Sequence, residues 1–294
     1  MYETLGPIIL RTLIVLTLLI TPSSWAQPGE GLFAVFTTSQ GEFTCELYFK
    51  RTPRTVANFI SLAEGSRSWV NFNTAKISNE QYYNQTTFHR VIKDFVIQGG
   101  SPNGTGTDGP GYRFRDELHQ ELKHDRSGIL SMAKTGQPHT NGSQFFVTLA
   151  PTPWLDEIHS VFGAVVEGQE IVDRIGQTPT GAGDRPIETQ MIETIRIVRS
   201  GSEAEGFDVH AVNPPLPSLQ LVPTTIQRAN EGLDLIWDAK ENHDYHAFYS
   251  DDFLKWGFQT VRPIGSASLG SFISNFPTQF FLFIESDHDL APTP

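Results

Sequence analysis

Two apolar segments lie within residues 32–48, a pattern typical of strands. The two apolar segments flank Ser39-Gln40-Gly41, which predicts a hairpin. A helix is predicted next, with Thr52 as its cap, Pro53 in its first turn and Gly65 at its end. One apolar face of this helix is formed by Val56, Phe59, Ile60 and Ala63.

Strand patterns dominate the rest of the chain up to Ser200. Further apolar segments occur at residues 88–100, 128–133, 144–149, 161–166 and 191–198. Residues 66–85 are polar and irregular, and glycine and proline predict a loop over residues 101–111. One more helix is predicted from Glu170 to Ile175, ended by Gly176. Many strands and two helices imply a mainly antiparallel sheet, closed as a barrel with helices over its ends.

A polar, proline-rich segment at residues 201–217 is typical of a linker between domains. Beyond it, apolar and aromatic segments predict strands at residues 233–237, 245–249, 256–261 and 280–285. We therefore expect a first domain over residues 32–200 and a small β-sandwich-like accessory domain over residues 218–294. A length of 294 residues accommodates both.

The first 26 residues have the pattern of a secretory signal. Arg11 precedes an apolar run too short to cross a membrane, and Pro22 and small residues follow it. Cleavage is expected after Ala26, which predicts a periplasmic or secreted protein with no stable membrane span after cleavage. The alternative is an N-terminal anchor that is retained.

The formal net charge of −12 argues against a general nucleic-acid binder, because such proteins need a basic surface. Cys45 is the single cysteine, so it has no disulfide partner in the chain. It alternates with Phe43 and Leu47, and we expect it to be buried as a small apolar residue.

The sequence lacks the residue patterns needed for a catalytic nucleophile, a metal site or a dinucleotide-binding site. Ser143 lies in NGSQFF, which lacks the glycine of a nucleophile elbow, and no base lies near Cys45 in sequence. His243, Asp244 and His246 have no further histidine or cysteine at a suitable interval, so we expect an exposed turn there. Gly104 and Gly106 lack the surrounding strand and helix of a dinucleotide site. No cofactor is predicted.

Arg90 stands out because its permanent charge lies in the apolar, amide-bearing segment FHRVIKDFVIQGG. Its neighbours supply an apolar wall and an amide, which is the composition of a small binding site. They are His89, Phe95, Val96, Ile97 and Gln98. The alternative is an arginine on a solvated strand edge, with its head in water.

Four segments carry a family resemblance. They are FHRVIKDFVIQGG at 88–100, GILSMAKTG at 128–136, NGSQFFVTLAP at 141–151 and WLDEIHSVFG at 154–163. On these motifs, residues 32–200 resemble a cyclophilin, a peptidyl-prolyl cis-trans isomerase, and the loop at 101–111 is similar to that of bacterial members. The resemblance implies an eight-stranded antiparallel barrel capped by two helices, with a proline pocket on its outer face.

The resemblance also implies which residues form the pocket. The expected catalytic residues are Arg90, Gln98, Phe95 and His159, and the expected substrate-binding residues are Val96, Ala133, Lys134, Gln144, Phe146, Trp154 and Leu155. Backbone groups of Ala133 and Lys134 would meet the substrate chain. Val96 replaces a usual methionine, and Lys134 replaces a common asparagine, which puts a positive charge beside the groove.

Isomerisation breaks no bond, so catalysis requires tighter binding of the twisted imide than of either planar isomer. Arg90 is the predicted donor to the proline nitrogen or the neighbouring carbonyl, Gln98 positions it, and His159 packs on the ring because no net proton transfer is needed. We expect an isomerase that acts on proline-containing polypeptides.

Two other functions stay open. One is a non-catalytic module or chaperone that binds proline segments, with partners selected by the C-terminal domain. The other makes that domain the main function, for surface or glycan attachment. By resemblance, Trp154 also suggests a cyclosporin-type ligand.

Overall fold

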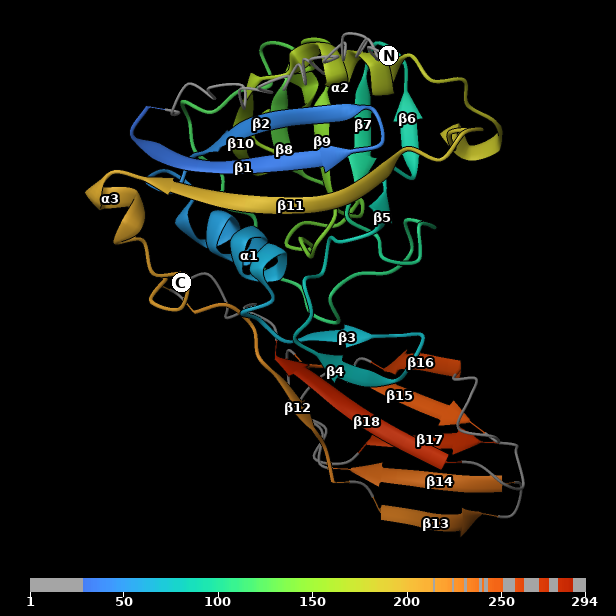
Figure 1. The fold of residues 1–294 in the computed structure, drawn as a ribbon. Helices are drawn as coiled ribbons and strands as arrows, with labels where there is room; N and C mark the ends of the chain where they lie inside the picture. The colour runs from blue at the N-terminus through green and yellow to red at the C-terminus, as the bar shows by residue number, and fades with distance from the viewer. Residues whose placement is uncertain are drawn as a thin grey trace, which may run out of the picture.

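The structure, a computed structural model, describes residues 29–213, 215–223, 225–229, 232–237, 240, 243–250, 257–261, 270–274 and 280–287. The predicted signal at residues 1–26 lies outside the described residues. Figure 1 shows a curled sheet with its helices in one unit and a smaller set of strands in a second. Among the helices of the described residues, none has the length and apolar character needed to cross a membrane.

The first unit is built on one antiparallel sheet in the order β5-β11-β1-β2-β10-β8-β9-β7-β6. Its strands are β1 (Gly31–Thr38), β2 (Gly41–Leu47), β5 (Thr86–Thr87), β6 (Arg90–Ile92), β7 (Val96–Gly99), β8 (Ile129–Met132), β9 (Phe145–Thr148), β10 (Val161–Glu167) and β11 (Met191–Ser200).

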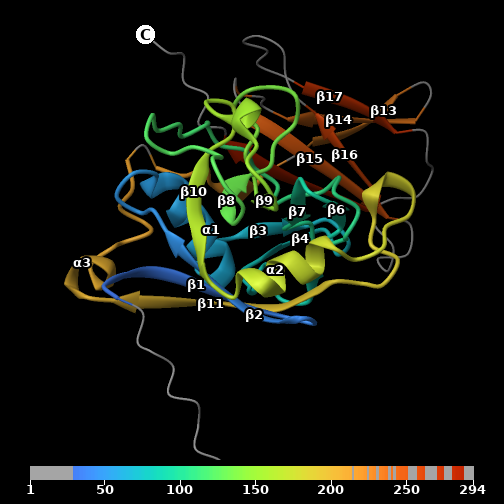
Figure 2. The same ribbon diagram turned by 90° about the horizontal axis from the view of Figure 1, so that it is seen from above.

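The sheet is strongly curled (Figures 1 and 2). β5 pairs with β11 at one end and β6 pairs with β7 at the other, yet only Phe88 and His89 separate β5 from β6 in the chain. The two short strands are therefore one interrupted strand, which explains why nine strands appear where eight are predicted. The expected mainly β fold with a curled antiparallel sheet is confirmed.

The predicted first helix is confirmed as α1 (Pro53–Glu64), with Gly65 in the left-handed conformation at its end (φ 72°). Its cap differs from the prediction, because Thr52 makes no capping hydrogen bond with its side chain. The carboxylate of Glu117 accepts hydrogen bonds from the backbone N–H of Thr55 at 2.7 Å and of Arg54 at 3.2 Å. A distant carboxylate thus satisfies the free donors of the first turn.

Two further helices are α2 (Gln169–Gly176) and α3 (Ser202–Glu205), and two short 3₁₀ helices are η1 (Pro153–Leu155) and η2 (Ala182–Asp184). The sequence predicts α2 but not α3, which falls inside the expected linker. Phe207 packs on Phe49 at 5.3 Å between ring centroids, and Ala204 and Val209 are buried. The segment over residues 201–217 is therefore packed against the first unit rather than free.

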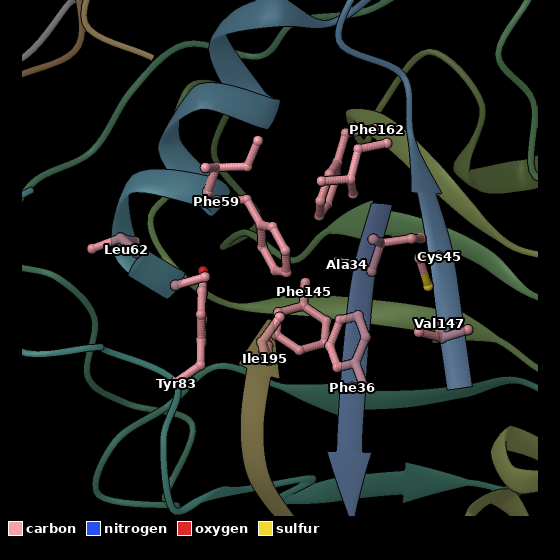
Figure 3. Close-up of a cluster of buried hydrophobic side chains, with 14 of the residues drawn as sticks. Ala34, Phe36, Cys45, Phe59, Leu62, Tyr83, Phe145, Val147, Phe162 and Ile195 are labelled. Atoms are coloured by element: carbon pink, nitrogen blue, oxygen red, sulfur yellow. The ribbon is translucent and has the colours of Figure 1, made fainter. Parts of the chain in front are cut away.

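The main core lies between α1 and the sheet, where aromatic rings from distant segments meet (Figure 3). Phe59 of α1 lies 5.3 Å from Phe162 and 5.7 Å from Phe145, measured between ring centroids. Cys45 is buried, as predicted, and burial raises the pKa of its thiol. Such close ring packing holds the strands of the site in fixed register.

The second unit contains two antiparallel sheets. Their strands are β12 (Leu219–Leu221), β18 (Phe280–Asp287), β15 (His243–Ser250) and β16 (Gly257–Val261) in one, and β13 (Thr225–Ala229), β14 (Gly232–Trp237) and β17 (Gly270–Ser274) in the other. The rings of Trp237 and Tyr245 lie 5.5 Å apart and connect the sheets. The four predicted strands are present here, although Trp256 lies outside the described residues; β12, β13 and β17 were not predicted.

A hairpin of β3 (Trp69–Asn71) and β4 (Lys76–Ser78) reaches from the first unit to the second (Figure 1). The prediction of an irregular segment there is wrong in this part. Val70 and Ala75 of this hairpin share a small buried cluster with Phe248 and Ile284 of the second unit. Because apolar side chains from both units form one cluster, the second unit is packed against the first.

Candidate active site

Three neighbouring strands align Arg90, Gln98 and Phe146 in one row. Arg90 of β6 is the register partner of Gln98 of β7, which is the register partner of Phe146 of β9. Side chains of register partners project from the same face of a sheet. The cation, the amide and the ring that were predicted from distant motifs are therefore neighbours on one surface.

Arg90 is held by an acid that was not predicted. Its Nε donates a hydrogen bond to Oδ2 of Asp184 at 3.2 Å, and the two side chains are 42% and 46% exposed. Asp184 comes from η2, which follows a loop far along the chain. The ion pair uses Nε, so it does not occupy the terminal nitrogens of the half-exposed guanidinium.

The predicted role of Gln98 as the positioner of Arg90 does not match its contacts. The side-chain N–H of Gln98 donates to Oε1 of Gln144 at 3.0 Å. Gln144 in turn donates to the carbonyl oxygens of Gly106 at 3.0 Å and Asp108 at 2.8 Å. The two amides thus link the sheet to the glycine-rich loop, whereas Asp184 contacts the arginine.

Aromatic residues form the apolar wall beside this row. Trp154 of η1 is 62% exposed and stacks on Phe95, with ring centroids 6.1 Å apart. Phe146 is buried and meets the ring of His159 edge-on at 5.5 Å. Val96 is buried, and Leu155 is half-buried. Two pairs of the predicted pocket residues are therefore in ring contact, Phe95 with Trp154 and Phe146 with His159.

His159 is oriented by the backbone. Its Nδ1 lies 2.9 Å from the carbonyl oxygen of Met132, so Nδ1 carries the hydrogen and donates it. Burial is the main cause that lowers the pKa of His159, which keeps the ring neutral at pH 7. A neutral ring suits an apolar wall.

A second histidine, which sequence reasoning missed, packs against the ring of Phe146. The ring of His124 stacks on Phe146 at 5.8 Å and is fully buried. Its Nδ1 donates to Asp156 Oδ1 at 3.0 Å, and its Nε2 lies 3.0 Å from Ser131 Oγ. Burial lowers the pKa of His124. No motif around His124 could have placed it against Phe146.

Lys134 presents its backbone rather than its charge. Its side chain is 6% exposed, and Nζ lies 2.7 Å from Oδ2 of Asp116, which is also buried. The predicted positive charge beside the groove is therefore neutralised by a buried ion pair. The N–H of Ala133 donates to the Gln144 carbonyl at 2.9 Å, so this N–H is already used within the sheet.

The histidines proposed for an exposed turn lie elsewhere than predicted. His243 and His246 belong to strand β15, where Asp244 and His246 are buried. In the described part of the chain, no cluster of three or more His, Cys, Asp or Glu residues is arranged to hold a metal ion. Ser143 is also buried, and its hydroxyl is hydrogen-bonded to Tyr82 and Gly100.

The fold is that of a proline isomerase. Residues 33–197 match the family described as cyclophilin type peptidyl-prolyl cis-trans isomerase/CLD, and the chain belongs to this family. The family match ends before the second unit begins. Its relatives and structural neighbours carry the same activity in their names, so the protein is a peptidyl-prolyl cis-trans isomerase of the cyclophilin type.

The chain is similar to peptidyl-prolyl cis-trans isomerase B of Streptomyces anulatus, with 47% identity over 170 residues that cover 57% of this chain and 97% of the relative. It is 45% identical to the human peptidyl-prolyl cis-trans isomerase-like 1 over 185 residues, 62% of this chain and 98% of that protein. A crystal structure of a Cryptosporidium parvum cyclophilin type isomerase is similar at a TM-score of 0.50 and 35% identity, covering 57% of this chain and 98% of that one.

Proposed function

We propose that this isomerase acts on Xaa-Pro bonds of exported polypeptides in the groove formed by β6, β7, β9 and η1, with Arg90 as the catalytic donor. The observation that carries the proposal is the row of Arg90, Gln98 and Phe146 on neighbouring strands, which sets one cation at the edge of an apolar wall. That arrangement suits a proline ring held in the wall with its imide bond at the guanidinium.

The chemistry follows from the imide bond itself. Resonance resists rotation by about 18–20 kcal/mol, and it is lost when the bond twists and the nitrogen lone pair becomes localised. A guanidinium N–H directed at that nitrogen, or at the adjacent carbonyl, stabilises the twisted state more than either planar isomer. Asp184 holds the guanidinium through Nε, so its terminal nitrogens make this contact.

The apolar residues hold the ring while the bond rotates. Phe95, Val96, Phe146 and Leu155 form the wall, Trp154 forms its rim, and His159 packs on the ring as a neutral group. Backbone groups of Ala133 and Lys134, together with the Gln144 amide, bind the chain beside the proline. Excluding water from this wall strengthens the donor contact of Arg90.

The proposal also covers the location of the enzyme and the architecture of its two units. The pattern of the first 26 residues supports export, and therefore a periplasmic or secreted isomerase. The pairing of β5 and β6 at opposite ends of one sheet supports a closed barrel of eight strands. The two sheets joined at Trp237 support a small sandwich-like accessory domain over residues 218–294.

Arg90→Ala tests the assignment. Its activity on a short proline peptide is expected to fall about 10²- to 10³-fold in kcat/KM, as for the loss of one transition-state donor. Arg126→Ala is the matched control, because Arg126 is an exposed arginine in a surface ion pair with Asp125. Exchange NMR measures the rate, and calorimetry with the same peptide measures binding.

The outcomes distinguish a catalytic isomerase from a non-catalytic proline-binding module. Lost turnover with retained peptide binding in Arg90→Ala supports the catalytic role. A wild type that binds the peptide without accelerating its isomerisation would instead favour the non-catalytic proline-binding module. Unchanged turnover in Arg90→Ala would remove Arg90 from the mechanism.

A further inference from the structure

A cavity of about 420 Å³ lies where the two units meet, and it continues the candidate groove. The groove side contributes the site residues Gln98, Ala133, Lys134 and Gln144. The opposite side contributes Asp244, His246, Phe258 and Thr260 of the second unit. A substrate chain that leaves the proline wall past Gln144 therefore runs between the two units.

The residues of the second unit form the far wall of this cavity, and contacts with the first unit hold this wall in position. Nε2 of His246 donates a hydrogen bond to the carbonyl oxygen of Gly111 at 2.7 Å, and its Nδ1 lies 3.0 Å from Oγ1 of Thr260. Arg113, next to the same loop, lies 3.4 Å from Asp244 of the second unit. Both contacts are buried on the side of the second unit, where they are least screened by solvent.

One loop connects the site to this wall. Gln144 holds the carbonyl groups of Gly106 and Asp108, and His246 holds that of Gly111. Gln144, which is expected to bind substrate, and His246 of the second unit thus bind the same short loop, residues 106–111. The two walls of the cavity therefore have a fixed separation.

The chemistry of the wall suits an uncharged, apolar side chain. Lys134 and Arg113 are ion-paired with Asp116 and Asp244, so their charges are balanced. Phe258 is 46% exposed, and its ring lies 4.6 Å from that of Phe72 at the tip of the hairpin.

Phe258 and Thr260 alternate along β16, so both project from one face of the strand. The cavity is lined by these two residues and not by Gln259 between them. The second unit therefore offers an aromatic side chain and a hydroxyl to whatever occupies the cavity.

We propose that the second unit forms the far wall of an extended substrate groove, and that Phe258 and Thr260 select proline substrates with an apolar or aromatic side chain in the segment that flanks the proline. The occupant is a further part of the same polypeptide, because the cavity shares Gln98, Ala133 and Gln144 with the groove. This inference rests on the proposed function of that groove.

The test compares proline peptides of two lengths on the full chain. A short peptide is the reference, and longer peptides carry either phenylalanine or aspartate in an extension on the N-terminal or the C-terminal side of the proline. The wild type is expected to prefer the phenylalanine peptide over the aspartate peptide on one of the two sides. Phe258→Ala is expected to raise KM for that peptide about 3- to 10-fold, the value of one aromatic contact, with kcat unchanged.

Leu221→Ala is the matched control, because Leu221 is an exposed apolar residue on β12, at the other end of the same sheet. Thr260→Trp, at an exposed position, is a second variant that fills the cavity without removing Phe258, and it is expected to lose the same preference. Circular dichroism of each variant checks that the strands are retained.

The proposal is overturned when the wild type treats the phenylalanine and aspartate peptides alike on both sides, or when Phe258→Ala and Thr260→Trp keep the wild-type preference. An equal loss in Leu221→Ala would overturn it as well. Failure of the proposed function has a different signature, because the wild type would then leave the short peptide at its uncatalysed rate.

Discussion

At the scale of single residues, the ion-pair partner of Arg90 decides how its guanidinium is presented. A guanidinium bound through Nε keeps its terminal nitrogens directed away from the ion pair. The sequence prediction assigned this positioning to Gln98, which is adjacent in the sheet but hydrogen-bonded to Gln144. The acid that performs it lies on η2, far away in the chain.

Asp184→Asn is therefore expected to lower kcat about 2- to 5-fold with little change in KM, the effect of losing one partly exposed ion pair. Asp184→Glu should restore part of the rate, because a carboxylate is again within reach of Nε. Glu203→Gln, which removes an exposed ion pair with Lys50, is the control. A purely structural role of Asp184 would give equal stability losses in both Asp184 variants without a selective change in kcat.

At the scale of elements, α1 shows how a distant side chain replaces a local signal. Pro53 and Gly65 define the ends of the helix as the sequence predicts, but its first N–H groups are bound by Glu117. The same carboxylate accepts a hydrogen bond from the hydroxyl of Thr55 at 2.8 Å. α1 in turn supplies Phe59 to the core under the sheet.

Glu117→Ala is expected to lower the free energy of unfolding by about 1–2 kcal/mol, the usual effect of losing an N-terminal cap. Glu121→Ala is the comparison, because Glu121 forms an exposed ion pair with Arg51 and no cap. Urea denaturation of both variants measures the difference. Equal stability of the two would show that the carboxylate contributes nothing to α1.

The elements also show where sequence reasoning reached its limit. The strands and helices with strong periodicity, such as β10 and α2, were predicted close to their observed ends. The hairpin of β3 and β4 was missed because its strands are only three residues long, which is too short for an alternating pattern to be recognised. His243 to His246 were assigned to a turn because packing against another unit cannot be recognised from the local sequence.

At the scale of the whole molecule, buried histidines couple stability to pH. Burial is the largest cause that lowers the pKa of His89 to about 4, from an ordinary value of about 6.5, with Arg185 adding to it. Burial likewise lowers the pKa of His124 and His159. In the unfolded chain these groups take up protons at higher pH than in the folded protein.

The free energy of unfolding is therefore expected to fall as the pH drops from about 6.5 to about 4, by up to about 3 kcal/mol for His89 alone. Above that window all three rings are neutral in both states, and the contribution is constant. Urea denaturation at a series of pH values measures the slope. His89→Asn should flatten it by the share of His89, whereas an unchanged slope would show that His89 does not titrate across folding.

The sequence by itself determined the family, the strand-rich first unit and the residues proposed for the proline pocket. These features depend on motifs and periodicities, which can be recognised from residues that are close together in the chain. Only the tertiary structure decided that Asp184 holds Arg90, that Asp116 neutralises Lys134 and that residues of both units line one cavity. Each of these contacts joins residues from separate segments, and only the pairing of the strands and the packing of the two units bring such residues together.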